Sequence, residues 1–441
     1  MRLGNIVLMG ALVAAGLALG ASQFTGVTQA EAQAARFAER NATIYTLPAG
    51  KLEKAIALDR TGRMLVVAET VWWLVLLVLL LQLGVVAGVR DWAVGLGRSR
   101  WVQGFSFVFA MLLVVRLLNL PLSVYGHHVA LSYGLSVEGW GSWLGDVAKM
   151  FALEWGIGGL LVMLMFWVMR KSPERWWFWF WIPSVAAVVA GVFVTPYVID
   201  PMFNKLEPLA QSNPALVERL EQVVARGGLE IPPERMYLMR ASAKSTQMNA
   251  YVTGFGASKR VVVWDTTVAK SSPDEISFIF AHEMGHYALG HVALGVTLTC
   301  IVLLPFFWLG YHGVRMLLRR YGAAWRIPSQ QDWGALAVLA LVLSVLSTAA
   351  DPVANGFSRK IEHNADVYGQ EAVHGIVADP QAVGVRSFQV LGEESLDDPT
   401  PHPVYDWWFG THPSIAFRAA FAKAYDPWAA GEGPKYFRER R

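Results

Sequence analysis

Residues 274–292 read DEISFIFAHEMGHYALGHV and contain an HExxH motif, HEMGH, at 282–286. In an α-helix the side chains at positions i and i+4 lie on one face, so His282 and His286 can bind one metal ion together. Glu283 follows the first histidine and can reach a water molecule on that metal. Two imidazoles, an open coordination position and a carboxylate base are the parts of a zinc hydrolase site.

A helix-start signal precedes the motif. Ser272-Pro273-Asp274-Glu275 has the pattern of a capping box with proline at the first helical position. We therefore predict a helix that begins here and carries the motif two to three turns further on. The apolar residues after the motif predict that this helix continues into a membrane span.

The composition is that of a membrane protein. Of the 441 residues, 54% are hydrophobic and 16% are charged, whereas soluble proteins have about 25% charged residues. Many of the 19 tryptophans lie near the ends of apolar runs, as in interfacial belts. A net charge of +3 is too small to indicate nucleic acid. We expect a lipid bilayer as a partner and no nucleic acid.

Seven apolar segments have about the length needed to cross a bilayer. They lie at about 6–21, 64–89, 104–124, 151–169, 176–198, 289–311 and 334–352. The first segment could instead be a cleaved signal peptide. We favour an uncleaved helix, because the pairing of the later apolar segments suggests that the first is also a membrane span. No internal repeat is visible, which disfavours a transporter built from inverted halves.

Changes in polarity divide the chain into four parts. These are an N-terminal membrane region with five spans (1–199), a catalytic unit (200–288), a region with two spans (289–356) and a C-terminal catalytic segment (357–441). The second part contains an amphipathic helix at 214–227 and strand-like runs at 235–239, 248–253 and 260–265. A helix, three strands and the motif helix indicate a small α+β unit.

Basic residues concentrate in three of the short loops between spans. They are Arg90, Arg98, Arg100, Arg170, Lys171, Arg175, Arg315, Arg319, Arg320 and Arg326. The positive-inside rule places these loops in the cytoplasm. If the loops after the second, fourth and sixth spans are cytoplasmic, the 200–288 unit after the fifth span lies on the non-cytoplasmic side. Two spans separate it from the C-terminal segment, so that segment lies on the same side. We expect an integral, multi-pass protein, of the plasma or inner membrane if bacterial.

A third metal ligand must come from outside the motif. Position 292 is valine, not the histidine of a metzincin, and His291 would point about 140° away on a continuous helix. Further on, Glu362 and Asp366 share one helix face. Glu362 would complete a His₂Glu site and Asp366 could orient a ligand. His363 is the rival ligand.

In these motifs the chain resembles the CAAX prenyl protease 1 family of integral-membrane zinc endopeptidases. The matching runs are HEMGH at 282–286, SRKIEHNAD at 358–366, NAYVTG at 249–254, RVVVWDT at 260–266 and THPSIAFR at 411–418. HExxH alone occurs in many families, but this combination is specific. The seven-span layout extends the resemblance over nearly the whole chain.

The resemblance implies one zinc ion per chain, held by His282, His286 and Glu362, with Glu283 as the catalytic base. It also implies a fold class. This is a mainly α membrane protein whose seven transmembrane helices enclose a water-filled chamber, closed by a small α+β catalytic unit of the gluzincin type. The substrate would be a peptide or protein, including membrane-associated or lipidated ones.

Two further assignments combine the resemblance with the residues. His412 matches the family's His-Pro element and is our candidate donor to the oxyanion of peptide hydrolysis; the alternative is an ordinary loop histidine. Arg418 could pair with Asp366 and brace the site. Asn249, Ala250 and Tyr251 resemble the family's substrate-binding strand, which would pair with an extended peptide; an ordinary sheet strand is the alternative.

Charged residues within the spans have two interpretations. Arg116 and Glu154 would face a water-filled chamber or form an ion pair between helices, because ionisable side chains seldom face lipid.

The sequence is also compatible with two other classes of protein. In a site-2-type intramembrane protease, Asp351 would replace Glu362 as the third ligand, although the expected NPxxDG surroundings are absent. A non-catalytic membrane chamber or binding protein could keep the motif for structure alone. The predicted external catalytic unit would also make a cytosolic prenylated substrate doubtful.

Overall fold

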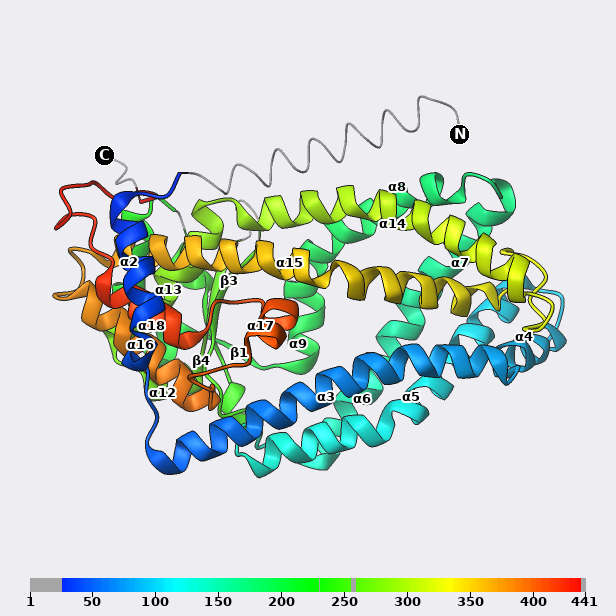
Figure 1. Cartoon of the computed structure of the whole chain (residues 1–441), viewed down its shortest axis with the longest axis horizontal. Coiled ribbons are helices and arrows are strands. Elements are labelled where there is room, and N and C mark those ends of the chain that lie inside the picture. Colours follow the sequence, from blue (N-terminus) through cyan, green and yellow to red (C-terminus); the bar gives the residue numbers. More distant parts are fainter. Residues whose placement is uncertain (1–25, 230, 255–258, 438–441) are drawn as a thin grey trace.

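The computed structural model describes residues 26–229, 231–254 and 259–437. It is an elongated, mainly helical molecule with long helices at one end and a compact mixed unit at the other (Figure 1). Six helical segments of the described chain are long and apolar enough to cross a membrane. They are Ala49–Gln82, Arg100–Ser132, Trp140–Lys171, Trp176–Phe203, His291–Tyr321 and Ala335–Val373. The predicted span at 6–21 lies outside the described residues.

The first described membrane helices form an antiparallel pair. After α2 (Gln29–Arg40), α3 (Ala49–Gln82) runs the length of the molecule to Gly84, whose φ of 72° ends it. Glycine accepts this left-handed conformation without a steric penalty. The chain continues through α4 (Val85–Gly95) and returns along α5 (Arg100–Ser132).

The next two spans contain wide π-helical turns. α6 (Trp140–Leu153) and α7 (Gly159–Lys171) are joined by the turn η2 (Glu154–Gly158). α8 (Trp176–Val194) and the short α9 (Asp200–Phe203) are joined in the same way by η3 (Thr195–Ile199). Such turns often mark functional positions in helices.

A four-stranded sheet follows the fourth candidate span of the described chain. Its strands are β1 (Leu206–Pro208), β2 (Met236–Met239), β3 (Ala250–Thr253) and β4 (Arg260–Trp264), in the order β1-β2-β4-β3. β2 and β4 are parallel, and the other pairs are antiparallel. Three strands lie within the runs predicted from the sequence; β1 was not predicted. α10 (Leu209–Ser212) and the amphipathic α11 (Pro214–Arg226) connect β1 to β2.

The HExxH helix is α13 (Pro273–Ala288), which follows α12 (Asp265–Lys270). It begins with the predicted capping box, in which Ser272 and Glu275 each accept a hydrogen bond from the other's backbone N–H. The prediction that it continues into a membrane span is wrong. Gly290 has a φ of 70° and breaks the chain before α14 (His291–Tyr321).

The C-terminal part is built on one long helix. α15 (Ala335–Val373) joins the predicted last span and the predicted helix after it into a single rod of 39 residues. α16 (Pro380–Ser395), α17 (Pro403–Phe409) and α18 (Ile415–Ala424) complete the chain. α15 therefore connects the membrane region directly to the mixed unit (Figure 1).

The two largest hydrophobic clusters lie at the two ends of the molecule. In the mixed unit, Phe278 and Phe280 of α13 pack with Val261 and Val263 of β4. In the membrane region, the buried residues come from α3, α4, α5, α7, α8, α14 and α15, and Trp176 is fully buried among them. The outer surface of the long helices remains apolar, as contact with lipid requires.

A buried ion-pair cluster ties α2 to the rest of the mixed unit. Glu31 is 2% exposed. Its carboxylate lies 3.1 Å from His363 Nε2 and 3.6 Å from Lys360 Nζ, and it also accepts a hydrogen bond from Lys435. Burial alone would raise the pKa of Glu31, but the hydrogen bonds from His363 and Lys435 outweigh it and hold the pKa at about 2.

We expect Glu31→Gln to destabilise the fold by about 3 kcal/mol, because it leaves buried cations without their partner. Thermal unfolding of detergent-purified protein measures this as a lower Tm. Since the native pKa is lowered, the stabilisation should be present above pH 4.5 and be lost as the pH falls towards 2. Glu39→Gln, an exposed position on the same helix, is the control; equal Tm values for the two variants would contradict the prediction.

Candidate active site

The two histidines of the HExxH motif meet across one turn of α13. His282 Nε2 lies 3.2 Å from His286 Nε2, as expected for positions i and i+4. His282 is buried and His286 is half-buried. The two ring nitrogens therefore face a common point beside the helix.

Glu362 of α15 reaches the same point. Its Oε2 lies 3.3 Å from His282 Nε2, and its Oε1 lies 3.6 Å from His286 Nε2. One donor atom from each of the three side chains lies within 4.8 Å of the others. Oε2 of Glu362 is buried and faces imidazole nitrogens, and burying a carboxylate is costly unless a cation or donor pairs with it. Two imidazoles and a carboxylate are a donor set that suits zinc.

Small residues allow α13 and α15 to approach closely enough for this geometry. A Cβ atom at Gly369 would lie 3.0 Å from the backbone nitrogen of His282. A Cβ atom at Gly285 would lie 3.2 Å from Cα of Ala365. Such contacts are tighter than most real Cβ contacts, so glycine at both positions lets the two backbones pack at this distance without being displaced.

Asp366 and Arg418 lie behind His282. Asp366 Oδ1 is 2.8 Å from His282 Nδ1. The Arg418 guanidinium donates two hydrogen bonds to the same carboxylate, at 2.9 and 2.7 Å. Such a contact fixes the orientation of the imidazole and leaves Nε2 free for a ligand role. The sequence-predicted pairing of Arg418 with Asp366 is present in the structure.

His291 supports the second histidine, and the sequence reasoning missed it. Its Nδ1 lies 3.1 Å from His286 Nδ1, and the residue is 4% exposed. The predicted angle of 140° assumed a continuous helix. The break at Gly290 turns the chain so that His291 returns to the site. Gly290 was itself the available signal, because glycine commonly ends a helix.

Glu283 lies beside the histidines. Its Oε1 is 4.0 Å from His282 Nε2, and its side chain is 23% exposed. Burial raises the pKa of Glu283 above its ordinary value. A raised pKa makes the carboxylate a better proton acceptor near neutral pH.

His412 enters the site from the loop between α17 and α18. Its Nε2 lies 3.3 Å from Glu362 Oε2, and its Nδ1 lies 2.9 Å from Thr411 Oγ1. The side chain is 53% exposed. A half-exposed imidazole at the open side of the three donors can contact a bound substrate.

The predicted substrate strand is an edge strand. β3 pairs with β4 and ends the sheet order, and it contacts α13. Ala250 is buried, Tyr251 is half-buried, and Asn249 precedes the strand. An edge strand next to the motif helix can accept an extended peptide as a further strand.

Comparisons with known proteins define the class and then the family. The profile "Peptidase family M48" matches residues 210–426, and "CAAX prenyl protease N-terminal, five membrane helices" matches residues 41–205. An uncharacterized metalloprotease of Bacillus subtilis is 33% identical over 351 residues, which are 80% of each chain. CAAX prenyl protease 1 of Saccharomyces cerevisiae is 31% identical over 44% of this chain and 42% of its own.

A solved structure shares the fold. Ste24p of S. mikatae superposes with a TM-score of 0.73 over 93% of this chain and 98% of that one, at 22% sequence identity. The protein is therefore an integral, multi-pass membrane metalloendopeptidase, and it requires a metal ion. It belongs to peptidase family M48 and resembles the CAAX prenyl proteases over most of its length.

We expect His291→Ala to weaken metal binding about 10- to 100-fold, because removing a group that orients a ligand has effects of this size. Titration of the metal-free protein with zinc measures the change. His312→Ala is the control, because His312 is an exposed histidine of the same helix. Unchanged zinc affinity in His291→Ala would show that His286 needs no such support.

Proposed function

We propose that His282, His286 and Glu362 bind one zinc ion and that Glu283 is the catalytic base of peptide hydrolysis. The observation that carries this proposal is the convergence of two imidazole Nε2 atoms and a buried carboxylate on one point. The Nδ1 atoms of both histidines face other side chains, so their Nε2 atoms are the ones left for the metal. When bound, zinc supplies a Lewis acid that activates water and polarises the peptide carbonyl.

The remaining roles are assigned to the chain's own side chains. Glu283 accepts a proton from the attacking water and passes it to the leaving amine. His412 donates a hydrogen bond to the carbonyl oxygen as negative charge develops there. Asp366 and Arg418 hold the imidazole of His282 in place.

The substrate that this site supports is an extended peptide. β3, with Asn249, Ala250 and Tyr251, would pair with its backbone. Residues 200–288 and 357–441 together would form a gluzincin-type unit that closes a chamber of seven spans. The six candidate spans of the described chain support a chamber made of membrane helices, but they do not test whether it has seven of them.

The distribution of charge supports a catalytic unit outside the cytoplasm. The basic segments after α3, at the end of α7 and at the end of α14 all lie at the end of the molecule opposite the sheet (Figure 1). By the positive-inside rule that end is cytoplasmic. The substrate would then be a membrane-associated peptide on the other side, and a cytosolic prenylated tail is disfavoured.

The site-2 alternative is disfavoured by distance along α15. Asp351 precedes Glu362 by 11 residues, which is about 16 Å of helix at 1.5 Å per residue. In the described chain the donor atoms that converge on the histidines come from Glu362. The alternative of a non-catalytic binding protein is set aside by membership of the peptidase family.

We expect about one zinc per chain in wild type and in Asp351→Asn, and far less in Glu362→Ala. Glu283→Gln should keep its zinc but lose 10²-fold or more of its peptidase activity, because a general base contributes about that much. Metal analysis of detergent-purified protein and cleavage of a fluorogenic peptide measure the two effects. Zinc retained in Glu362→Ala but lost in Asp351→Asn would favour the site-2 alternative.

The orientation has its own test in a background without the native cysteine, Cys300→Ala. We expect Lys423→Cys, on α18, to react with a membrane-impermeant maleimide in intact bacterial spheroplasts. Arg98→Cys, in the basic loop before α5, should react only after lysis. Both positions are exposed on the protein. The reverse pattern would place the catalytic unit in the cytoplasm.

A further inference from the structure

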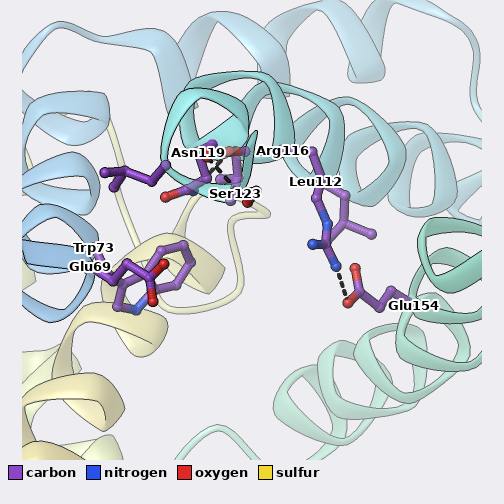
Figure 2. Close-up of a pocket in the computed structure, with 9 residues that line it drawn as sticks. Glu69, Trp73, Leu112, Arg116, Asn119, Ser123 and Glu154 are labelled. Carbon is purple, nitrogen blue, oxygen red and sulfur yellow. Dashed lines mark hydrogen bonds and ion pairs between the residues drawn. The ribbon is translucent and has the colours of Figure 1, made fainter. Parts of the chain in front are cut away.

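Two adjoining cavities lie between the membrane helices, apart from the metal site. The first has a volume of about 470 Å³ and lies between α3, α5 and η2 (Figure 2). Its polar lining residues are Glu69, Arg116, Asn119, Ser123 and Glu154. The second, of about 510 Å³, lies between α3 and α15 and shares Glu69 and Trp73 with the first. Volumes of this size are typical of ligand sites.

The first cavity has an unbalanced negative charge. Arg116 and Glu154 form an ion pair, so their charges offset one another. The side chain of Glu69 makes no hydrogen bond or ion pair with any described residue. A carboxylate within a membrane-spanning helix is costly and usually has a functional partner. The charge that would complete this cavity is therefore positive.

The surroundings of Glu69 suit a cationic side chain. The indole of Trp73 lies beside Glu69 on α3 (Figure 2), and its nitrogen donates a hydrogen bond to Ser344 of α15 at 2.8 Å. A carboxylate and an aromatic ring together are favourable for an ammonium or guanidinium group. A purely apolar chain would remove water from the charged lining without replacing its interactions.

A polar stripe on α15 connects the cavities to the metal site. The residues Ser344, Thr348, Asp351, Asn355, Ser358 and Glu362 recur at intervals of four and three, which places them on one helix face. Ser344 and Thr348 line the second cavity. Val353, which is off this stripe, is 79% exposed. The metal site and the cavities therefore lie along one polar face of α15, which also contacts α3 through Ser344 and α17 through Asn355.

The length of this path can be expressed in peptide residues. Thr348 precedes Glu362 by 14 residues, which is about 21 Å of helix. An extended peptide covers about 3.3 Å per residue. A substrate cleaved at the metal site would therefore place a side chain about six residues away at the cavities.

We propose that these cavities bind a basic side chain, lysine or arginine, of the peptide substrate, about six residues from the cleaved bond. Glu69 pairs with its cationic group, and Trp73 covers it. This inference rests on the proposed function and adds a rule for substrate selection to it. The preference comes from electrostatic pairing between this cationic group and the carboxylate of Glu69.

A lysine scan tests the rule. The substrates are 20-residue peptides of alanine, serine and glutamine in which one lysine is moved along the sequence. Mass spectrometry identifies the cleaved bond. For wild type we expect the cut to move with the lysine at a constant separation of about six residues, and kcat/KM to exceed that of the lysine-free peptide about tenfold.

Substitutions at Glu69 identify the group responsible. Glu69→Gln should bring the ratio of kcat/KM between lysine and lysine-free peptides close to one, and Glu69→Lys should shift the preference to a glutamate at the same position. Glu53→Gln, an exposed position on the same helix, should leave the ratio unchanged. A cut that ignores the lysine, or a preference that survives Glu69→Gln, would overturn the proposal.

A binding measurement separates this proposal from the catalytic one. Fluorescence anisotropy of labelled peptides on the Glu283→Gln protein reports affinity without turnover. The lysine peptide should bind about tenfold more tightly than the lysine-free peptide, and adding Glu69→Gln should remove that difference. If wild type binds zinc but cleaves no peptide, the proposed function is wrong. The difference in affinity between the lysine and lysine-free peptides still tests whether the cavities bind a basic side chain. Equal affinities of the two peptides would overturn it.

Discussion

The close packing of α13 against α15 is the contact on which the site depends. Gly285 and Gly369 allow the two backbones to approach until a carboxylate of one helix lies 3.3 Å from an imidazole of the other. A methyl group at either glycine would push the opposite helix away by a few tenths of an ångström, and cores resist such displacements because they are densely packed. The proposed metal ligands therefore belong to a closely packed pair of helices rather than to loops.

Groups from α15 itself and from two further helices, α14 and α18, contact or brace the histidines of this pair. Asp366 contacts His282 and is held by Arg418 of α18, while His291 of α14 contacts His286. Each imidazole thus uses its Nδ1 atom for orientation and presents its Nε2 atom to the metal position. Because these supports come from α14, α15 and α18, the site is complete only when the mixed unit and the membrane region fold together.

α15 unites the two halves of the molecule. Its C-terminal end carries Glu362 and Asp366 in the mixed unit, and its N-terminal end packs in the membrane core. Along one face it has serine, threonine, asparagine and acidic residues, although the helix is apolar enough to cross a membrane. Ser344 and Thr348 of this face line one of the membrane cavities, and Glu362 of the same face lies at the histidines.

The sequence by itself determined the local features. Positions i and i+4 put His282 and His286 together, the capping box fixed the start of α13, and long apolar runs identified the membrane helices, because helical periodicity needs no tertiary contact. Glu362 could only be proposed, since about 80 residues separate it from the motif. Only the tertiary structure brought it to the histidines, joined α15 into one rod and returned His291 to the site through the turn at Gly290. Those features depend on where one helix ends and how closely two helices pack, and neither follows from residue spacing alone.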